Sequence, residues 1–251
     1  MKEISRPTDK PALTFSFHDK QGRRTLGHQE LGVEIAAMYK PRRLGLISDS
    51  HGNFPATEEA VNILIDRGCE QVIHLGDFCD TNRRDRLEDM IRLFQQRGVI
   101  AVKGNNDYLI ELALASGSVA GCSDQDRLYK FIKGIPMKVV MDDICFAHSF
   151  PFDYLRAFYE PIDVGSTERA FLLFQQMSYR ILFCGHSHTP VYFRLSDPEG
   201  VLREVAPPGG KLLLDPATRY IVIVGSSAEG ECAIYDAGES TYERINIFSS
   251  G

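Results

Sequence analysis

The sequence predicts an α/β fold whose second half is richer in strands than in helices. Between residues 43 and 105, three short apolar runs alternate with two segments whose apolar residues have helical spacing, and this order is typical of parallel βαβ units. After residue 138 most of the apolar runs are short, and turns rich in Pro, Gly and Asp, such as residues 197–200, separate them. Such turns indicate hairpins.

The boundaries of the first elements follow from these patterns. The run at 44–48 precedes a helical segment at 57–67 that Gly68 closes, and the run at 71–75 precedes one at 86–96 that Gly98 closes. A glycine directly after the last periodic residue is a common helix end. The third run is 99–102, and we expect two more helices at 108–115 and 167–177. Further strands are expected at 138–140, 144–147, 181–184, 191–195, 211–214, 220–224, 232–235 and 242–247.

Residues 1–40 differ from the rest because they are polar and show little periodicity. We expect an N-terminal extension over residues 1–40, with a short strand at 13–17 and a helix near 31–38. A single domain is expected over residues 41–251.

Composition excludes some classes of protein. The apolar fraction of 43% and charged fraction of 25% are ordinary for a globular chain. A formal charge of −6 argues against nucleic acid as the main partner, although bound cations would still allow a small anionic substrate. No run approaches the ~20 apolar residues that span a bilayer, and residues 1–12 lack the apolar core of a secretory signal. The six scattered cysteines, without a CxxC pair, favour free thiols and a cytoplasmic location.

Residue types that bind metals follow five of the apolar runs directly. In α/β sheets, ligands bind beyond the carboxyl ends of the strands, so loops far apart in sequence can surround one small volume. Any one of these motifs alone would be read as a polar cap or turn, but five together favour a metal site. The motifs are Asp49-Ser50-His51, Gly76-Asp77, Gly104-Asn105, Ala147-His148 and Gly185-His186-Ser187-His188.

The donor types indicate which ions this site would hold. A carboxylate such as Asp77 has two oxygens and can bridge two cations, Asn105 offers a neutral carbonyl oxygen, and the histidines offer nitrogens. Mixed nitrogen and oxygen ligands suit manganese, iron, nickel, cobalt or zinc better than magnesium or calcium.

The five motifs, in this order, resemble those of the calcineurin-like metallophosphoesterase family, and in particular its small bacterial and archaeal phosphodiesterase-like branch. The resemblance runs from residue 49 to 188 and extends to a late Gly-Ser turn at 224–227. It implies a four-layer α/β/β/α sandwich of two mixed sheets flanked by helices. It also implies hydrolysis of phosphoester bonds at a dinuclear centre of two divalent metal ions, for which manganese is expected first. A hydroxide that bridges the ions would be the nucleophile.

The resemblance also implies a role for each motif residue. The first ion would be held by Asp49, His51, Asp77 and His188. The second would be held by Asp77, Asn105, His148 and His186, so that Asp77 bridges the two. The residues expected to be catalytic are Asp77, Asn105 and His148.

The chain departs from the family pattern at Asn106, where many members have a histidine that protonates the leaving group. This predicts a preference for good leaving groups and favours a small phosphodiester or nucleotide as substrate. Asp107 is expected to be structural and to orient a ligand histidine. The late turn also lacks the arginine that relatives often have there.

Several alternatives stay open at this point. The same cluster could serve a Ser/Thr protein phosphatase, or a non-catalytic metal-binding scaffold. His74 fits a satisfied core histidine or a support for a ligand. Phe150, Phe152 and Tyr154 fit ordinary packing or stacking on a nucleotide base. The sequence does not indicate the oligomeric state.

Overall fold

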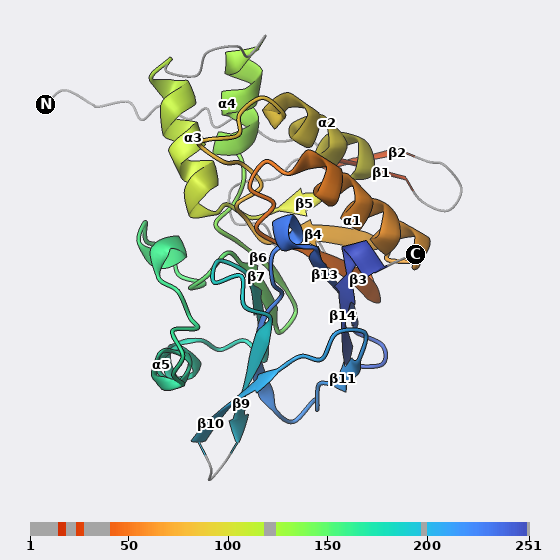
Figure 1. Cartoon of the computed structure of the whole chain (residues 1–251), viewed down its shortest axis with the longest axis vertical. Helices are drawn as coiled ribbons and strands as arrows, with labels where there is room; N and C mark the ends of the chain where they lie inside the picture. Colours follow the sequence, from red (N-terminus) through yellow and green to blue (C-terminus); the bar gives the residue numbers. More distant parts are fainter. Residues whose placement is uncertain (1–14, 19–23, 28–40, 118–123, 197–199, 250–251) are drawn as a thin grey trace, which may run out of the picture.

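The computed structural model describes residues 15–18, 24–27, 41–117, 124–196 and 200–249. Two mixed six-stranded sheets pack face to face, with helices on both outer faces (Figure 1). The first sheet has the order β11 (Lys211–Leu213), β14 (Thr241–Asn246), β13 (Glu231–Asp236), β3 (Arg43–Ile47), β4 (Gln71–His74), β5 (Ile100–Ala101). The second has the order β10 (Gly200–Val205), β9 (Val191–Ser196), β12 (Arg219–Ile223), β8 (Ile181–Cys184), β7 (Ile144–Ala147), β6 (Lys138–Met141).

Each sheet contains three neighbouring parallel strands, which end at the edge strand β5 in the first sheet and lie between antiparallel strands in the second. In the first sheet β3, β4 and β5 run parallel, and in the second β7, β8 and β12 do so, whereas their outer neighbours are antiparallel. An apolar layer between the sheets includes Leu46, Ile73, Phe146, Phe183 and Tyr235, all of which are buried. This layer holds the two sheets together, so loops from both sheets can contribute to one site.

Helices form the outer layers. Four helices form the layer outside the first sheet, and α5 (Glu168–Gln176) covers the second (Figure 1). The four are α1 (Phe54–Asp66), α2 (Leu87–Arg97), α3 (Asn105–Ala115) and α4 (Gln125–Lys133). Separate apolar clusters fill the space under α1–α4 and under α5. The predicted four-layer α/β/β/α sandwich is therefore confirmed.

Helix α4 and strand β10 are among the elements that were not predicted. Helix α4 begins where the Asp124 side chain accepts from the Arg127 amide at 3.1 Å, and it buries Leu128 and Ile132. Strand β10 follows the predicted turn and pairs with β9 along its whole length. The first helix after β5 also starts earlier than expected, at Asn105, because the Asp107 carboxylate caps the Gly104 amide at 2.8 Å.

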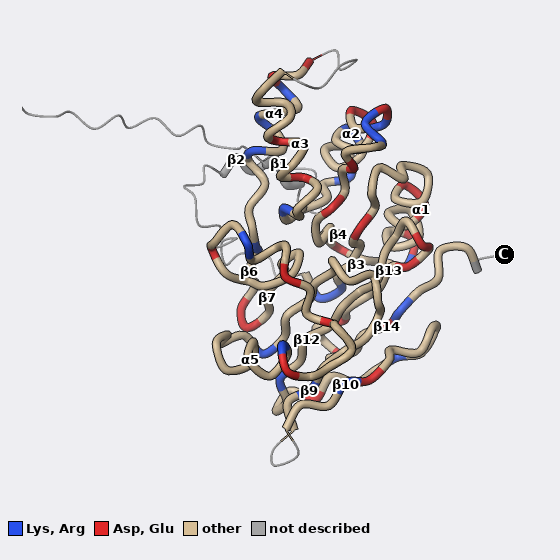
Figure 2. The backbone as a smooth tube through the Cα atoms, turned by 60° about the vertical axis from the view of Figure 1, so that its left-hand side comes forward, with Lys and Arg blue, Asp and Glu red and all other residues tan. Residues whose placement is uncertain are grey.

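The remaining predictions on organisation have mixed outcomes. Strands β1 (Phe15–His18) and β2 (Arg24–Gly27) form a separate antiparallel pair, and β1 overlaps the strand predicted at 13–17. The helix predicted near 31–38 lies outside the described residues. The five cysteines in the described part of the chain are free. Among the described helices, none has the length and apolar character that a membrane span requires. Acidic and basic residues are mixed along α2 and α4 (Figure 2).

Candidate metal centre

The structure brings all seven predicted ligand side chains to one place, where loops from both sheets meet. Three of the loops follow β3, β4 and β5 in the first sheet, and two follow β7 and β8 in the second. In chain order, these loops carry Asp49 and His51, Asp77, Asn105, His148, and the pair His186 and His188.

One group of side chains, which we name the open cluster, consists of Asp49, His51 and His188. His51 Nε2 lies 3.1 Å from His188 Nε2, and His188 Nε2 lies 3.4 Å from Asp49 Oδ1. The ligand atoms of these three residues are close enough together to hold one metal ion.

A second group, which we name the closed cluster, consists of Asn105, His148 and His186. His148 Nε2 lies 3.1 Å from both Asn105 Oδ1 and His186 Nδ1. Asp77 lies between the two groups, because its Oδ2 atom is 3.5 Å from His148 Nε2 and 4.0 Å from His51 Nε2.

The electrostatics of Asp49 fit a bound cation. Its Oδ2 atom accepts from Ser48 Oγ at 2.5 Å and from the His186 amide at 2.9 Å, but its buried Oδ1 atom has no hydrogen-bond partner. Burial raises the pKa of Asp49, yet His188 and His148 outweigh this effect and lower the pKa to about 2. A buried, ionised oxygen without a donor is costly, and a divalent ion beside imidazole nitrogens would satisfy it.

The outer nitrogens of three histidines have acceptors of their own. His148 Nδ1 lies 2.8 Å from the Leu75 carbonyl oxygen, and His186 Nε2 lies 3.3 Å from that of Tyr159. His188 Nδ1 lies 3.1 Å from Glu229 Oε1. An acceptor on the outer nitrogen leaves the inner nitrogen's lone pair free for a metal, which is the usual arrangement of metal-binding histidines.

The backbone at the site is strained. Seven non-glycine residues of the described chain have positive φ, and five of them are predicted ligands with φ between 44° and 69°. Such conformations cost of order 1–3 kcal/mol each and concentrate at functional sites. The five are Asp49, His51, Asp77, His186 and His188.

Asn106 and Asp107, which follow Asn105, hold the neighbouring loop that carries Asp77. Buried Asp107 accepts from the backbone amides of Asp77 at 2.8 Å, Cys79 at 2.9 Å and Gly104 at 2.8 Å. The expectation that it bonds a ligand histidine is therefore wrong, although its structural role is as predicted. Asn106 donates from Nδ2 to Asp77 Oδ2 at 2.7 Å and from its amide to Oδ1 at 2.8 Å. Asn106 thus holds the carboxylate that lies between the clusters.

His74 is a core histidine that also supports a ligand loop, but it is not the satisfied histidine that was predicted, because its buried Nδ1 atom has no hydrogen-bond partner. Burial lowers its pKa to about 3, so the ring is neutral, and it packs against Phe78 and Phe94. Its Nε2 atom lies 2.7 Å from Ser50 Oγ, in the loop between Asp49 and His51. A core histidine therefore also supports the open cluster.

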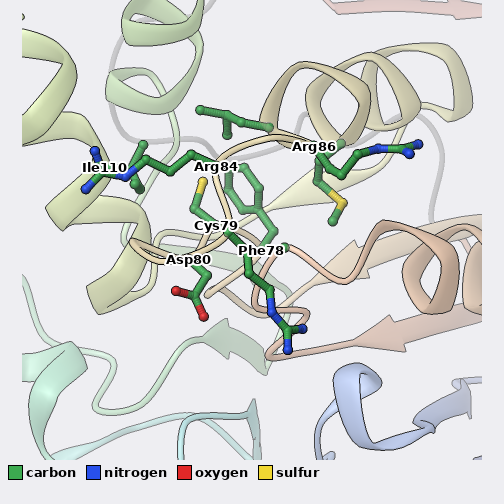
Figure 3. Close-up of a pocket in the computed structure, with 10 residues that line it drawn as sticks. Phe78, Cys79, Asp80, Arg84, Arg86 and Ile110 are labelled. Carbon is green, nitrogen blue, oxygen red and sulfur yellow. The ribbon is translucent and has the colours of Figure 1, made fainter. Parts of the chain in front are cut away.

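The loop after Asp77 encloses a cavity that is too small for a substrate. Figure 3 shows Arg84 extending toward Ile110 on α3, whereas Arg86 points in the opposite direction, over the Phe54 ring at 4.5 Å. The cavity beneath Phe78 and the arginines measures about 10 Å³, which is roughly the space for one water. It is thus no candidate for the reacting ester.

The fold and this site define a class of protein. A family model described as the calcineurin-like phosphoesterase superfamily domain matches residues 43–216. The chain belongs to this superfamily, as its motifs predicted.

Individual proteins resemble this chain to different degrees. "Phosphodiesterase MJ0936" of Methanocaldococcus jannaschii is 25% identical over 156 residues, which cover 62% of this chain and 78% of the relative. The solved metallophosphoesterase from Sphaerobacter thermophilus superposes with a TM-score of 0.65 at 22% identity, covering 82% of this chain and 89% of that one. An archaeal phosphodiesterase gives a TM-score of 0.47 at 19% identity over 81% and 99% of the two chains. The likeness to the solved structures concerns the fold alone.

Proposed function

We propose that this protein hydrolyses small phosphate esters at a centre of two divalent ions. The single observation that carries the proposal is the position of Asp77, whose Oδ2 atom lies near a histidine nitrogen of each cluster. A carboxylate shared by two sets of nitrogen and oxygen donors offsets the repulsion between two cations. The mixed nitrogen and oxygen donor set suits manganese, iron, nickel, cobalt or zinc, and we propose manganese as the first of these to test.

Each cluster would hold one ion, with Asp77 common to both. When bound, the ions would supply a water of lowered pKa as nucleophile and would stabilise charge on the phosphate oxygens. The chain's own contribution is orientation: backbone carbonyl oxygens hold the His148 and His186 rings, and Asn106 holds Asp77. Asn106 is an amide and cannot donate a proton to a leaving group, which supports substrates with good leaving groups.

A second feature supports a substrate with an aromatic group, such as a nucleotide. A cavity of about 240 Å³ lies between α5 and the segment after His148, and its lining includes Phe150, Phe152 and Tyr154. The last two rings stack, with centroids 5.8 Å apart and planes 16° apart. Because this volume lies below the ~300 Å³ of common ligand pockets, it suits one ring system rather than a whole nucleotide.

A screen of esters and metals tests the proposed function. The protein is stripped with a chelator, reloaded with each of the five metals, and assayed on bis-p-nitrophenyl phosphate, dinucleotides, p-nitrophenyl phosphate and a phosphoserine peptide. We expect metal-dependent turnover that is fastest on the diesters. Preferred turnover of the peptide would favour the Ser/Thr phosphatase alternative, and two bound ions without turnover would favour the scaffold. Full activity in the stripped protein would contradict the proposal.

The aromatic cavity has its own test. Tyr154→Ala should raise KM for a dinucleotide by about tenfold, since aromatic stacking contributes roughly 0.5–1.5 kcal/mol, with little change in kcat. Phe171→Ala, which removes an exposed ring of α5 outside the cavity lining, is the matched control. Equal KM values for both variants and the wild type would assign the cavity to packing alone.

A further inference from the structure

The loop after β12 is fastened to the loop that carries Asp49. Ser226 Oγ donates to the Asp49 carbonyl oxygen at 2.8 Å, and the Ser227 amide donates to the Ser48 carbonyl oxygen at 2.8 Å. Ser227 Oγ also lies 2.8 Å from Ser50 Oγ. These bonds are buried, so they fix the short helical turn Ser227–Glu229 beside the open cluster.

This turn presents Glu229 to one side of His188. Glu229 Oε1 lies 3.1 Å from His188 Nδ1, while Nε2 on the other edge of the ring lies 3.4 Å from Asp49 Oδ1. Glu229 therefore contacts the nitrogen that faces away from Asp49, and it does not enter the cluster itself.

Glu229 differs from the partners of the other ligand histidines. His148 and His186 are held by backbone carbonyls, and the nearest carboxylate to His51 Nδ1, that of Asp80, lies 3.7 Å away, beyond a normal hydrogen bond. Within the described chain, Glu229 is thus the one side chain within hydrogen-bond distance of an outer nitrogen among these histidines. No Lys or Arg occurs in residues 224–230, so this turn offers no cation to a substrate phosphate.

We propose that Glu229 is a positioning residue that holds His188 ready for the first ion, an inference that rests on the proposed metal centre. Its carboxylate accepts the Nδ1 proton and orients the ring, so that Nε2 faces the open cluster. Removing a hydrogen-bond partner of this kind from a metal-binding histidine typically weakens metal binding 10–100-fold.

Because the Glu229 side chain is exposed, its effect on His188 can be measured separately from any effect on folding. The Glu229 side chain is 63% exposed, so truncating it removes the bond to His188 and little packing. Glu229→Ala should therefore fold like the wild type, and Glu229→Gln should keep an oxygen that can accept the Nδ1 proton. The matched control is Glu239→Gln, because Glu239 is exposed at the opposite end of β13.

The test is calorimetric titration of Mn²⁺ into the metal-free full-length variants, with the visible absorption of Co²⁺ as a second readout. We expect Glu229→Ala to weaken one of two binding events by about 10–100-fold and to alter the Co²⁺ spectrum. The other event should stay unchanged, and Glu229→Gln and Glu239→Gln should stay within about threefold of the wild type.

Three results would overturn the inference. Wild-type affinities in Glu229→Ala would show that His188 needs no partner, while leaving the metal centre intact. A loss in Glu229→Gln as large as in Glu229→Ala would assign the effect to negative charge rather than to the hydrogen bond. A wild-type protein that binds no ion would overturn both this inference and the proposed function.

Discussion

The two halves of the candidate metal centre are built differently. In the closed cluster, the His148 side chain is fully buried and His186 is partly buried, and backbone carbonyls hold the outer nitrogens of both. In the open cluster, the His51 and His188 side chains are 22% and 32% exposed, and His188 is held by an exposed glutamate. A backbone carbonyl that accepts from a histidine can move only together with the surrounding fold, whereas a side chain that accepts from a histidine can rotate away on its own. We therefore expect the ion of the closed cluster to bind more tightly and exchange more slowly.

The largest expected effect comes from the residue that the two halves share. Asp77→Asn removes a charge from both clusters and should lower kcat by at least about 10³-fold, because a two-metal site depends on both ions. Diester hydrolysis at saturating metal measures it. Asp80→Asn, a change in the same loop at a residue 3.7 Å from His51, should cost less than about tenfold. Near wild-type activity in Asp77→Asn would refute a shared ligand.

Single ligand deletions test the difference between the halves. His148→Ala should remove one ion and lower kcat by about 10²–10³-fold even at high metal concentration, since it deletes a fully buried donor of the closed cluster. His51→Ala lies in the exposed half, so added metal should recover part of its activity. Metal analysis after gel filtration gives the ion count for each variant. Equal losses and equal rescue would remove the distinction between open and closed clusters.

A variant of Asp107 tests how much its hydrogen bonds to the loop that carries Asp77 stabilise the fold. Asp107→Ala leaves three buried amides without an acceptor. Because each unsatisfied amide costs roughly 1 kcal/mol or more, the variant should lower the free energy of unfolding by about 3 kcal/mol. Urea denaturation of the metal-free protein measures this value. Asp66→Ala, an exposed position at the end of α1, serves as control and should change it by less than about 0.5 kcal/mol.

The smallest expected effect is a pH dependence of metal affinity. The neighbouring Asp49 carboxylate raises the pKa of His188 to about 9, and Glu229 acts in the same direction. At neutral pH the metal-free ring is therefore protonated, and a metal ion must displace this proton. Affinity at the open cluster should rise by up to about tenfold per pH unit and level off above pH 9. Calorimetry in buffers of different ionisation enthalpy should show proton release, and pH-independent affinity would contradict this account.

Much of the fold followed from local patterns. The helical spacing of apolar residues before Gly68 and Gly98 predicted α1 and α2 to within a few residues. The turn at 197–200 predicted a hairpin. Helix α4 was missed although Asp124, Leu128 and Ile132 carry the signals of a capped amphipathic helix. The early start of α3 could not be predicted, because it depends on a cap that Asp107 provides while also binding the loop after β4.

The sequence alone determined which residues could form a metal centre, because Asp, Asn and His were placed directly after strands and strand ends converge. Only the tertiary structure decided how those residues are held: Asn106 turned to Asp77, Asp107 bound to backbone amides, and Glu229 bound to His188 across 41 positions of the chain. Ligand types follow from local chemistry and strand boundaries. The partners that orient them depend on which loops the packing of two sheets brings together, and no local pattern encodes that.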